Sequence, residues 1–194
     1  MVTGKKSPFT GQEVQVIAAG GIFNGQSLAA ALMLGASAVW VGTRFVLCDE
    51  ANAPKAHQEA VRTAGFEDNV RTLIFTVSFF APLSLRWCAN QLLFQGRPLR
   101  VRMNPYIQNW EENRQNEIKE LTAKGKIPVE YDMEQMGDDI DDDTLDNARP
   151  FLMGKAAAVV NERKPAKQIV DEMVSEAVQW MQTGNSYIVS KSKF

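Results

Sequence analysis

The sequence predicts a mixed α/β fold, and three observations near its start carry this prediction. Residues 14–19 (VQVIAA) and 38–42 (AVWVG) are short, nearly continuous apolar runs, typical of strands buried on both faces of a parallel sheet. Between them, the alanine-rich residues 27–34 have the spacing of an amphipathic helix, and Gly35 can end that helix in the left-handed conformation. Together they form a strand–helix–strand unit, whose crossover we expect to be right-handed.

Helices dominate the predicted structure downstream of this unit. A helix is predicted over residues 49–64, with Asp49 as its N-cap and Gly65 at its end, and a strand is predicted over residues 70–76. Three further helices are predicted over residues 110–124, 151–160 and 165–181. The last of them carries a wide apolar stripe formed by Ile169, Val170, Met173, Val174, Ala177, Val178 and Met181.

Composition excludes several classes of protein. Lysine and arginine number 21 and aspartate and glutamate 23, a net charge of −2, so no basic excess indicates nucleic acid or a membrane surface as a partner. Cys48 and Cys88 have neither the spacing of a metal site nor that of a disulfide framework. Residues 1–15 lack the apolar core of a secretory signal, and the apolar residues 73–85 are too few for a membrane span. We therefore expect an intracellular protein in the cytoplasm.

Glycines follow both predicted strands of the first unit. Gly20-Gly21 leave backbone N–H groups uncovered ahead of the predicted helix, where aligned amides and the helix dipole favour an anion. Gly42-Thr43 add a second bare N–H and a hydroxyl after the next strand. One such glycine pair is explained by a tight turn alone. Two of them on successive parallel strands favour phosphate binding, as between strands 7 and 8 of a (β/α)8 barrel.

A family resemblance rests on the same residues. The most specific stretch is VIAAGGIFNGQSLAAALMLGASAVWVGTRFVLCDEA, which closely resembles the C-terminal flavin-binding portion of the nitronate monooxygenases, formerly called 2-nitropropane dioxygenases. The resemblance covers residues 14–76 and 96–184 and includes GRPLRVRMNPYIQNWEENRQNEIKEL. It implies a partial (β/α)8 TIM barrel, its last βα units, followed by a mostly helical C-terminal region. It also implies FMN as cofactor, with its phosphate held by Ala19, Gly20, Gly21, Gly42 and Thr43.

The implied reaction is the oxidation of a small alkyl nitronate by O₂, in which the flavin carries the difficult step. The family's catalytic histidine belongs to a portion without a counterpart in this chain, so no residue here inherits its role. We interpret His57 as a surface histidine of a helix. The chain is therefore expected to be a C-terminal fragment that is inactive alone. Two alternatives are a non-catalytic remnant or mispredicted gene product with at most flavin-phosphate binding, and an FMN-dependent enoyl-acyl-carrier-protein reductase.

The sequence divides into four expected segments. Residues 1–13 are unassigned, residues 14–76 hold the last barrel strands with the phosphate site, and residues 96–194 form the helical region. Residues 77–95 match nothing in the family, and removing them joins IFT to GRPLRV as in relatives. Because their Val-Ser start and Gln end can be encoded by splice signals, we hypothesise a translated intron or insertion; a buried helix or hairpin is the alternative.

Other residues receive simpler interpretations. Trp40 is expected in the core. Arg97 and Arg100 are expected either to reach a phosphate or acidic substrate or to pair with Glu111 or Glu112. No metal site is predicted. A cluster of acidic residues lacks the glycine spacing of a calcium loop, and we interpret it as a solvated loop that caps the following segment. It consists of Asp138, Asp139, Asp141, Asp142 and Asp143. Lys155 stands where a glutamine is expected in relatives.

Overall fold

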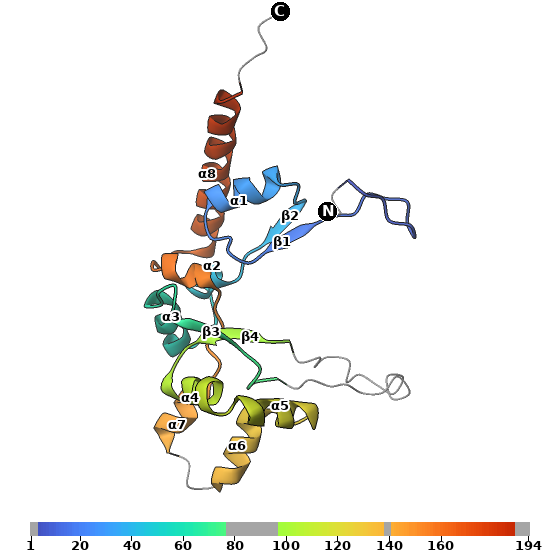
Figure 1. Cartoon of the computed structure of the whole chain (residues 1–194). Helices are drawn as coiled ribbons and strands as arrows, with labels where there is room; N and C mark the ends of the chain where they lie inside the picture. The colour runs from blue at the N-terminus through green and yellow to red at the C-terminus, as the bar shows by residue number, and fades with distance from the viewer. Residues whose placement is uncertain (1–3, 77–96, 138–140, 189–194) are drawn as a thin grey trace, which may run out of the picture. The chain divides into compact units, whose positions relative to one another are not determined.

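The computed structural model describes residues 4–76, 97–137 and 141–188 (Figure 1). The chain forms two compact units, one made of Met1–Phe66 with Gly154–Phe194 and the other of Glu67–Met153. Among the helices in these described ranges, none is long and apolar enough to cross a membrane. The suspected insertion at residues 77–95 lies outside the described residues, and the four-segment division of the sequence stays a prediction.

The first unit contains the predicted strand–helix–strand. Strands β1 (Ile17–Ala19) and β2 (Ala38–Trp40) are parallel, with Ala19 paired to Trp40, and helix α1 (Gly25–Met33) connects them. Gly35 follows α1 with a φ of 97°, as predicted for its role as a helix stop. The prediction of a βαβ unit is confirmed, although both strands are shorter than their apolar runs.

The two faces of this small sheet differ in burial. Ala18 and Val39 pack against a core formed with helix α8 (Ala166–Ser186). The side chains of Ile17 and Trp40 point to the other face, because side chains alternate along a strand, and they are 59% and 72% exposed. The prediction that both strands are buried on two faces, with Trp40 in the core, is therefore wrong for the described residues.

Two short helices follow β2. Helix α2 (Thr43–Val46) begins directly after Gly42, and helix α3 (Lys55–Arg62) begins after Pro54. The single helix predicted over residues 49–64 is wrong at its start. Because the residue before a proline disfavours the helical conformation, the helix does not extend to the N-terminal side of Pro54 and begins at Lys55. Asp49 is not its N-cap; its carboxylate instead lies 3.4 Å from the guanidinium of Arg163.

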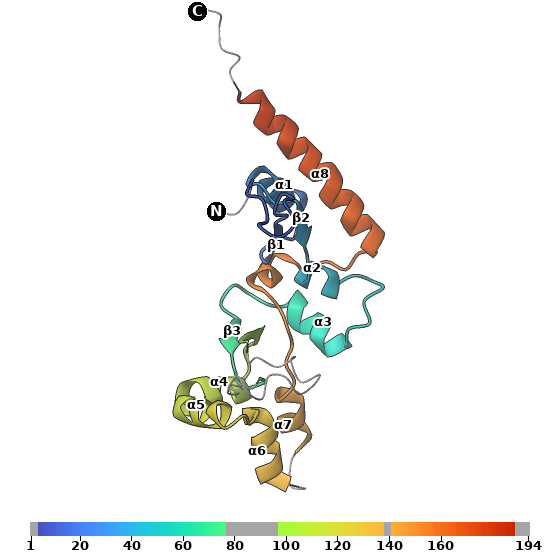
Figure 2. The same cartoon turned by 90° about the vertical axis from the view of Figure 1, so that its right-hand side faces the viewer.

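Helix α8 occupies the position where a helix with an apolar stripe was predicted, and it runs along α1 (Figure 2). One row of the stripe, Ile169, Met173 and Ala177, is buried. The adjacent row stays about half exposed and consists of Val170, Val174 and Val178. The helix predicted over residues 151–160 is wrong: only Lys155–Val159 is helical, as the 3₁₀-helix η3, because the Phe151 carbonyl and the Met153 N–H are engaged by Arg102 and Arg100 backbone groups.

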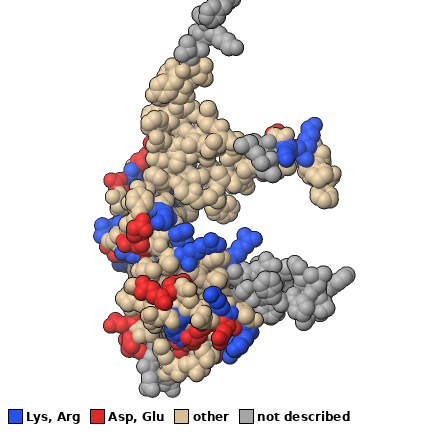
Figure 3. Space-filling model, in the orientation of Figure 1, with Lys and Arg blue, Asp and Glu red and all other residues tan. Residues whose placement is uncertain are grey.

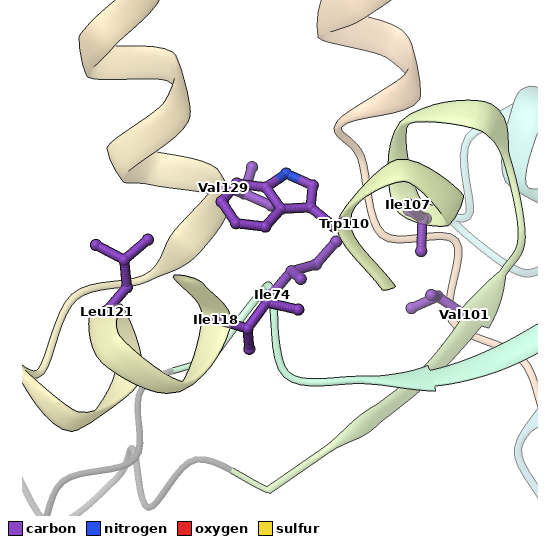
Figure 4. Close-up of a cluster of buried hydrophobic side chains, with 7 residues drawn as sticks. All are labelled: Ile74, Val101, Ile107, Trp110, Ile118, Leu121 and Val129. Atoms are coloured by element: carbon purple, nitrogen blue, oxygen red, sulfur yellow. The ribbon is translucent and has the colours of Figure 1, made fainter. Parts of the chain in front are cut away.

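Within its described residues, the second unit combines an antiparallel pair of strands with four helices. Strand β3 (Asn69–Thr72) pairs antiparallel with β4 (Leu99–Arg102). The helices are α4 (Pro105–Asn113), α5 (Gln115–Ala123), α6 (Pro128–Met136) and α7 (Asp142–Asn147). Its core is shown in Figure 4 and consists of Ile74, Val101, Ile107, Trp110, Ile118, Leu121 and Val129.

Arg114 separates two helices in the region where a single helix was predicted over residues 110–124. Its backbone, with φ −120° and ψ 23°, separates α4 from α5. Its guanidinium lies 3.4 Å from the centre of the Trp110 ring and donates to both carboxylate oxygens of Asp132 at 3.0 Å. Tyr106 donates to the same carboxylate at 2.9 Å. These contacts tie α4 and α6 together at the break, which periodicity alone did not indicate.

Candidate functional site

The first glycine turn follows β1 directly. Gly20 and Gly21 have φ values of 92° and 75°, a region in which L-residues with a side chain are strained. A Cβ built on either glycine would meet no heavy atom within 4 Å. The backbone of this turn therefore faces open space, and the need for glycine comes from its dihedral angles rather than from crowding.

The second turn follows β2. Gly42 is the residue before α2, and Thr43 is the first residue of that helix. A Cβ on Gly42 would also meet no heavy atom within 4 Å. Because Ala19 is paired with Trp40, the two turns leave the same end of two neighbouring parallel strands. The structure thus brings all five predicted site residues together at the carboxyl ends of β1 and β2.

The Thr43 hydroxyl already has one partner. Its Oγ1 accepts a hydrogen bond from the backbone N–H of Gly154 at 2.9 Å, which leaves the hydroxyl proton to donate. The next residue, Lys155, donates from Nζ to the Phe66 carbonyl at 3.0 Å. This lysine, at the position where glutamine was expected, is thus committed to a backbone carbonyl of its own unit.

The start of α1 is occupied by protein groups. Asn24 accepts from the Ser27 N–H at 2.9 Å, and the Ser27 hydroxyl accepts from the Asn24 N–H at 3.2 Å, a reciprocal cap. The N–H of Gly25 donates to Oε2 of Glu176 at 2.7 Å. A carboxylate of α8 therefore already interacts with the positive end of α1, and an anion at the first glycine turn relies on the turn's own amides. Sequence analysis missed Glu176, because it is 151 positions away from Gly25.

Two other predicted features have structural roles. His57 lies on α3, as predicted, and is partly exposed. The Asp141 carboxylate accepts from the Thr144 N–H at 2.7 Å and so caps α7, as predicted for this acidic loop. Within the ranges that the structure describes, no group of three or more His, Cys, Asp or Glu residues could hold a metal ion.

An open cavity of about 380 Å³ lies between β1 and α1. Gly20 and Gly21 line it, but Gly42 and Thr43 do not. Most of its walls are apolar, contributed by Ala18, Ile22 and Leu34 among others. The cavity therefore suits an apolar neighbour more than a phosphate.

A parallel strand–helix–strand with glycine turns at its carboxyl ends defines the class: part of a (β/α)8 barrel, followed by a mostly helical region. Residues 9–80 match the family model of the nitronate monooxygenases. Over these residues the chain is similar to nitronate monooxygenases, which are oxidoreductases.

Individual relatives agree with this family. A nitronate monooxygenase of Pseudomonas aeruginosa is 57% identical over 47 residues, which are 24% of this chain and 13% of that protein. A probable nitronate monooxygenase of Bacillus subtilis is 33% identical over 86 residues, 44% of this chain and 25% of the relative. The solved structure of FabK from Thermotoga maritima is 27% identical with a TM-score of 0.62, over 92% of this chain and 49% of that one. The chain thus spans half or less of these proteins.

Proposed function

We propose that this chain is the phosphate-holding part of an FMN-dependent oxidoreductase of the nitronate monooxygenase type. The observation that carries the proposal is the pairing of the two glycine turns. Gly21 and Gly42-Thr43 leave the same end of two parallel strands, and a side chain would meet no neighbour at either glycine. A phosphate fits such a place, because backbone N–H groups can approach it without obstruction.

The proposed contacts are the backbone N–H groups of Ala19, Gly20, Gly21, Gly42 and Thr43, the residues that the family resemblance selects. The Thr43 hydroxyl adds one donor, since Gly154 uses only its acceptor side. When bound, FMN would supply the electron transfer to O₂. The chain's own part is to anchor the flavin by its phosphate and thereby orient the ring system.

The proposed substrate is a small alkyl nitronate, oxidised with O₂. We assign no base to this chain, because the partly exposed His57 lies on α3 and not among the proposed phosphate contacts. We further propose that residues 1–194 alone do not turn over. Within the described residues the parallel sheet has two strands, whereas a closed barrel has eight.

The proposal is tested by flavin titration of the purified chain, with binding followed by the quenching of flavin fluorescence. The Gly21→Ala variant is expected to weaken FMN binding about tenfold, because it strains the turn and displaces its amides. The matched control is Gly11→Ala, which also replaces an open glycine of positive φ, 69°, but outside the proposed site. Equal FMN affinity in both variants, or no binding by the unmodified chain, would contradict the proposal.

Activity separates the candidate reactions. Oxygen consumption with an alkyl nitronate is expected to be absent for the chain alone. Flavin-dependent oxidation of NAD(P)H without nitronate turnover would instead support the enoyl-acyl-carrier-protein reductase alternative.

A further inference from the structure

The antiparallel strands of the second unit carry arginines on one face. In the register of β3 and β4, Arg71 lies opposite Arg100 and Asn69 lies opposite Arg102. Residues directly opposite each other share a face, so these four side chains lie together, while the neighbouring pair Val70 and Val101 faces the core. Figure 3 shows lysine and arginine side chains gathered over β4. We call Asn69, Arg71, Arg100 and Arg102 the arginine face.

The charges of the arginine face are only partly neutralised. Arg102 lies 3.3 Å from the Asp68 carboxylate. Arg100 donates from Nη1 to Oδ1 of Asn69 at 3.0 Å, a neutral partner. No carboxylate contacts Arg71 within the ranges that the structure describes. Like charges directly opposite on a sheet are destabilising, so the pairing of Arg71 with Arg100 favours an anion between them.

Asn69 provides an independent indication. The residue is only 8% exposed, and its Nδ2 has no hydrogen-bond partner. Exchanging the positions of Oδ1 and Nδ2 would not give Nδ2 a partner. Arg100 donates a hydrogen bond and needs an acceptor, and Oδ1 is the only acceptor in the Asn69 side chain. The unpartnered Nδ2–H₂ therefore lies beside the guanidinium of Arg100. A buried donor without a hydrogen-bond partner lowers the stability of the folded chain. Here the Asn69 donor lies next to the guanidinium donors of Arg100, so an acceptor from a ligand could satisfy both.

We propose that the arginine face binds an oxyanion, a carboxylate or phosphate group of a small-molecule ligand. Arg71 and Arg100 neutralise its charge, and Asn69 Nδ2 donates the third contact after a small shift of the Arg100 side chain. All residues of this site belong to the unit Glu67–Met153, whereas the proposed flavin-phosphate site belongs to the other unit. The inference therefore goes beyond the proposed flavin binding and does not rest on it.

The test is a titration of the full, ¹⁵N-labelled chain, followed by NMR of the arginine Nε–H and asparagine side-chain signals. The probes are inorganic phosphate and butyrate, each compared with chloride at the same ionic strength. Saturable shifts of the Arg71, Arg100 and Asn69 signals are expected. A response to phosphate alone or to butyrate alone identifies which oxyanion the ligand carries, and either one supports the site.

Variants distinguish a built site from general surface charge. Arg71→Gln is expected to weaken probe binding about tenfold, as for the loss of one charge-assisted contact. Arg149→Gln removes the same charge from the same unit at a 68% exposed side chain and is expected to change binding less than about twofold. Asn69→Asp keeps the acceptor for Arg100 but replaces the free donor with a negative charge, so it should abolish binding while the chain stays folded by circular dichroism.

Three results would overturn the proposal. The first is the absence of saturable probe binding by the unmodified chain. The second is an equal loss of probe affinity in Arg71→Gln and Arg149→Gln. The third is unchanged probe binding by a folded Asn69→Asp variant. Gly21→Ala, which tests the flavin site, is expected to leave the phosphate response of the arginine face intact. The two sites therefore fail or succeed separately.

Discussion

The backbone N–H of Gly25 donates to Oε2 of Glu176 across 2.7 Å, and this contact joins the first turn of α1 to the middle of α8. The helices can come this close only because Gly25 has no side chain. A Cβ at this position would lie 2.5 Å from Met173 O, from Ala177 N and from the Glu176 Cβ. The glycine that opens α1 is thus selected by helix packing and not by its dihedral angles.

The first prediction follows from that packing. Gly25→Ala forces α1 away from α8, because two of the three nearest atoms are backbone, and we expect the free energy of unfolding to fall by about 1–3 kcal/mol. Gly184→Ala is the control, because Gly184 lies in α8 with open space around it, and alanine favours a helix by roughly 0.5–1 kcal/mol over glycine. Urea denaturation of both variants measures the difference. Equal stability of the two would contradict the close contact.

The second prediction concerns the charge of Glu176. Glu176→Gln keeps the side-chain shape but removes the negative charge from the start of α1, so we expect a loss of about 0.5–1 kcal/mol in unfolding free energy. The loss should shrink in high salt, since salt screens this interaction. Glu134→Gln on the exposed surface of α6 is the control and should be nearly neutral. A salt-independent loss would indicate packing instead of charge.

The third prediction concerns the pair of Arg114 and Asp132. Asp132 is 6% exposed and accepts hydrogen bonds from both Arg114 and the Tyr106 hydroxyl. Asp132→Asn removes one of the two carboxylate partners of Arg114, while Glu117 stays as the other. We expect a loss of about 1–3 kcal/mol in unfolding free energy, measured by urea denaturation. In contrast, Asp146→Asn breaks the pair with Arg149, in which both side chains are about 70% exposed, and should cost less than ~0.5 kcal/mol.

The fourth prediction is an alkaline effect at Tyr106. Burial, with a smaller contribution from the hydrogen bond to Asp132, raises the pKa of Tyr106 above its ordinary value of 10.0. The folded chain therefore holds the phenol proton at a pH where the unfolded chain releases it. The corresponding stability is complete below pH 10.0 and is lost as the pH rises above that value. Tyr106→Phe should lessen this loss in unfolding experiments. In the unmodified chain, one tyrosine should ionise late by absorbance at 295 nm.

The fifth prediction concerns the exposed face of the β1–β2 sheet. Trp40→Thr is expected to change stability by less than about 0.5 kcal/mol, because Trp40 is 72% exposed. The same change should reduce self-association in light scattering, since an open apolar strand face promotes it. Val39→Thr, on the packed face of the same strand, should instead destabilise the chain. Unchanged self-association of Trp40→Thr would contradict this role of the face.

The helices and strands that could be predicted from the sequence are those determined by the spacing of nearby apolar residues and glycines. The parallel strands and α1 between them followed from apolar runs and from Gly35, and α8 followed from its stripe. The arrangement of Gly20-Gly21 and Gly42-Thr43 at one end of the sheet also followed, because parallel strands joined by a helix end at the same edge. Their contact with a flavin phosphate stays a prediction.

What the sequence did not indicate depends on contacts between distant residues. The break at Arg114 arises from Asp132, which lies 18 positions further along the chain. Strand β4 was missed, because its arginines alternate with only two apolar residues, and its partner β3 precedes it by about 30 positions. The exposure of Trp40 was also unpredictable, since an apolar strand pattern does not state which neighbours cover it.

The bond between Gly25 and Glu176 also has a consequence for biosynthesis. The first unit is assembled from two separate segments, so α1 waits for α8 until the ribosome has made residues 166–186. Glu67–Met153 is complete earlier and can fold while its neighbour is still unfinished. A stop codon ahead of α8 would therefore spare the arginine face and leave the glycine turns without the helix that closes their unit.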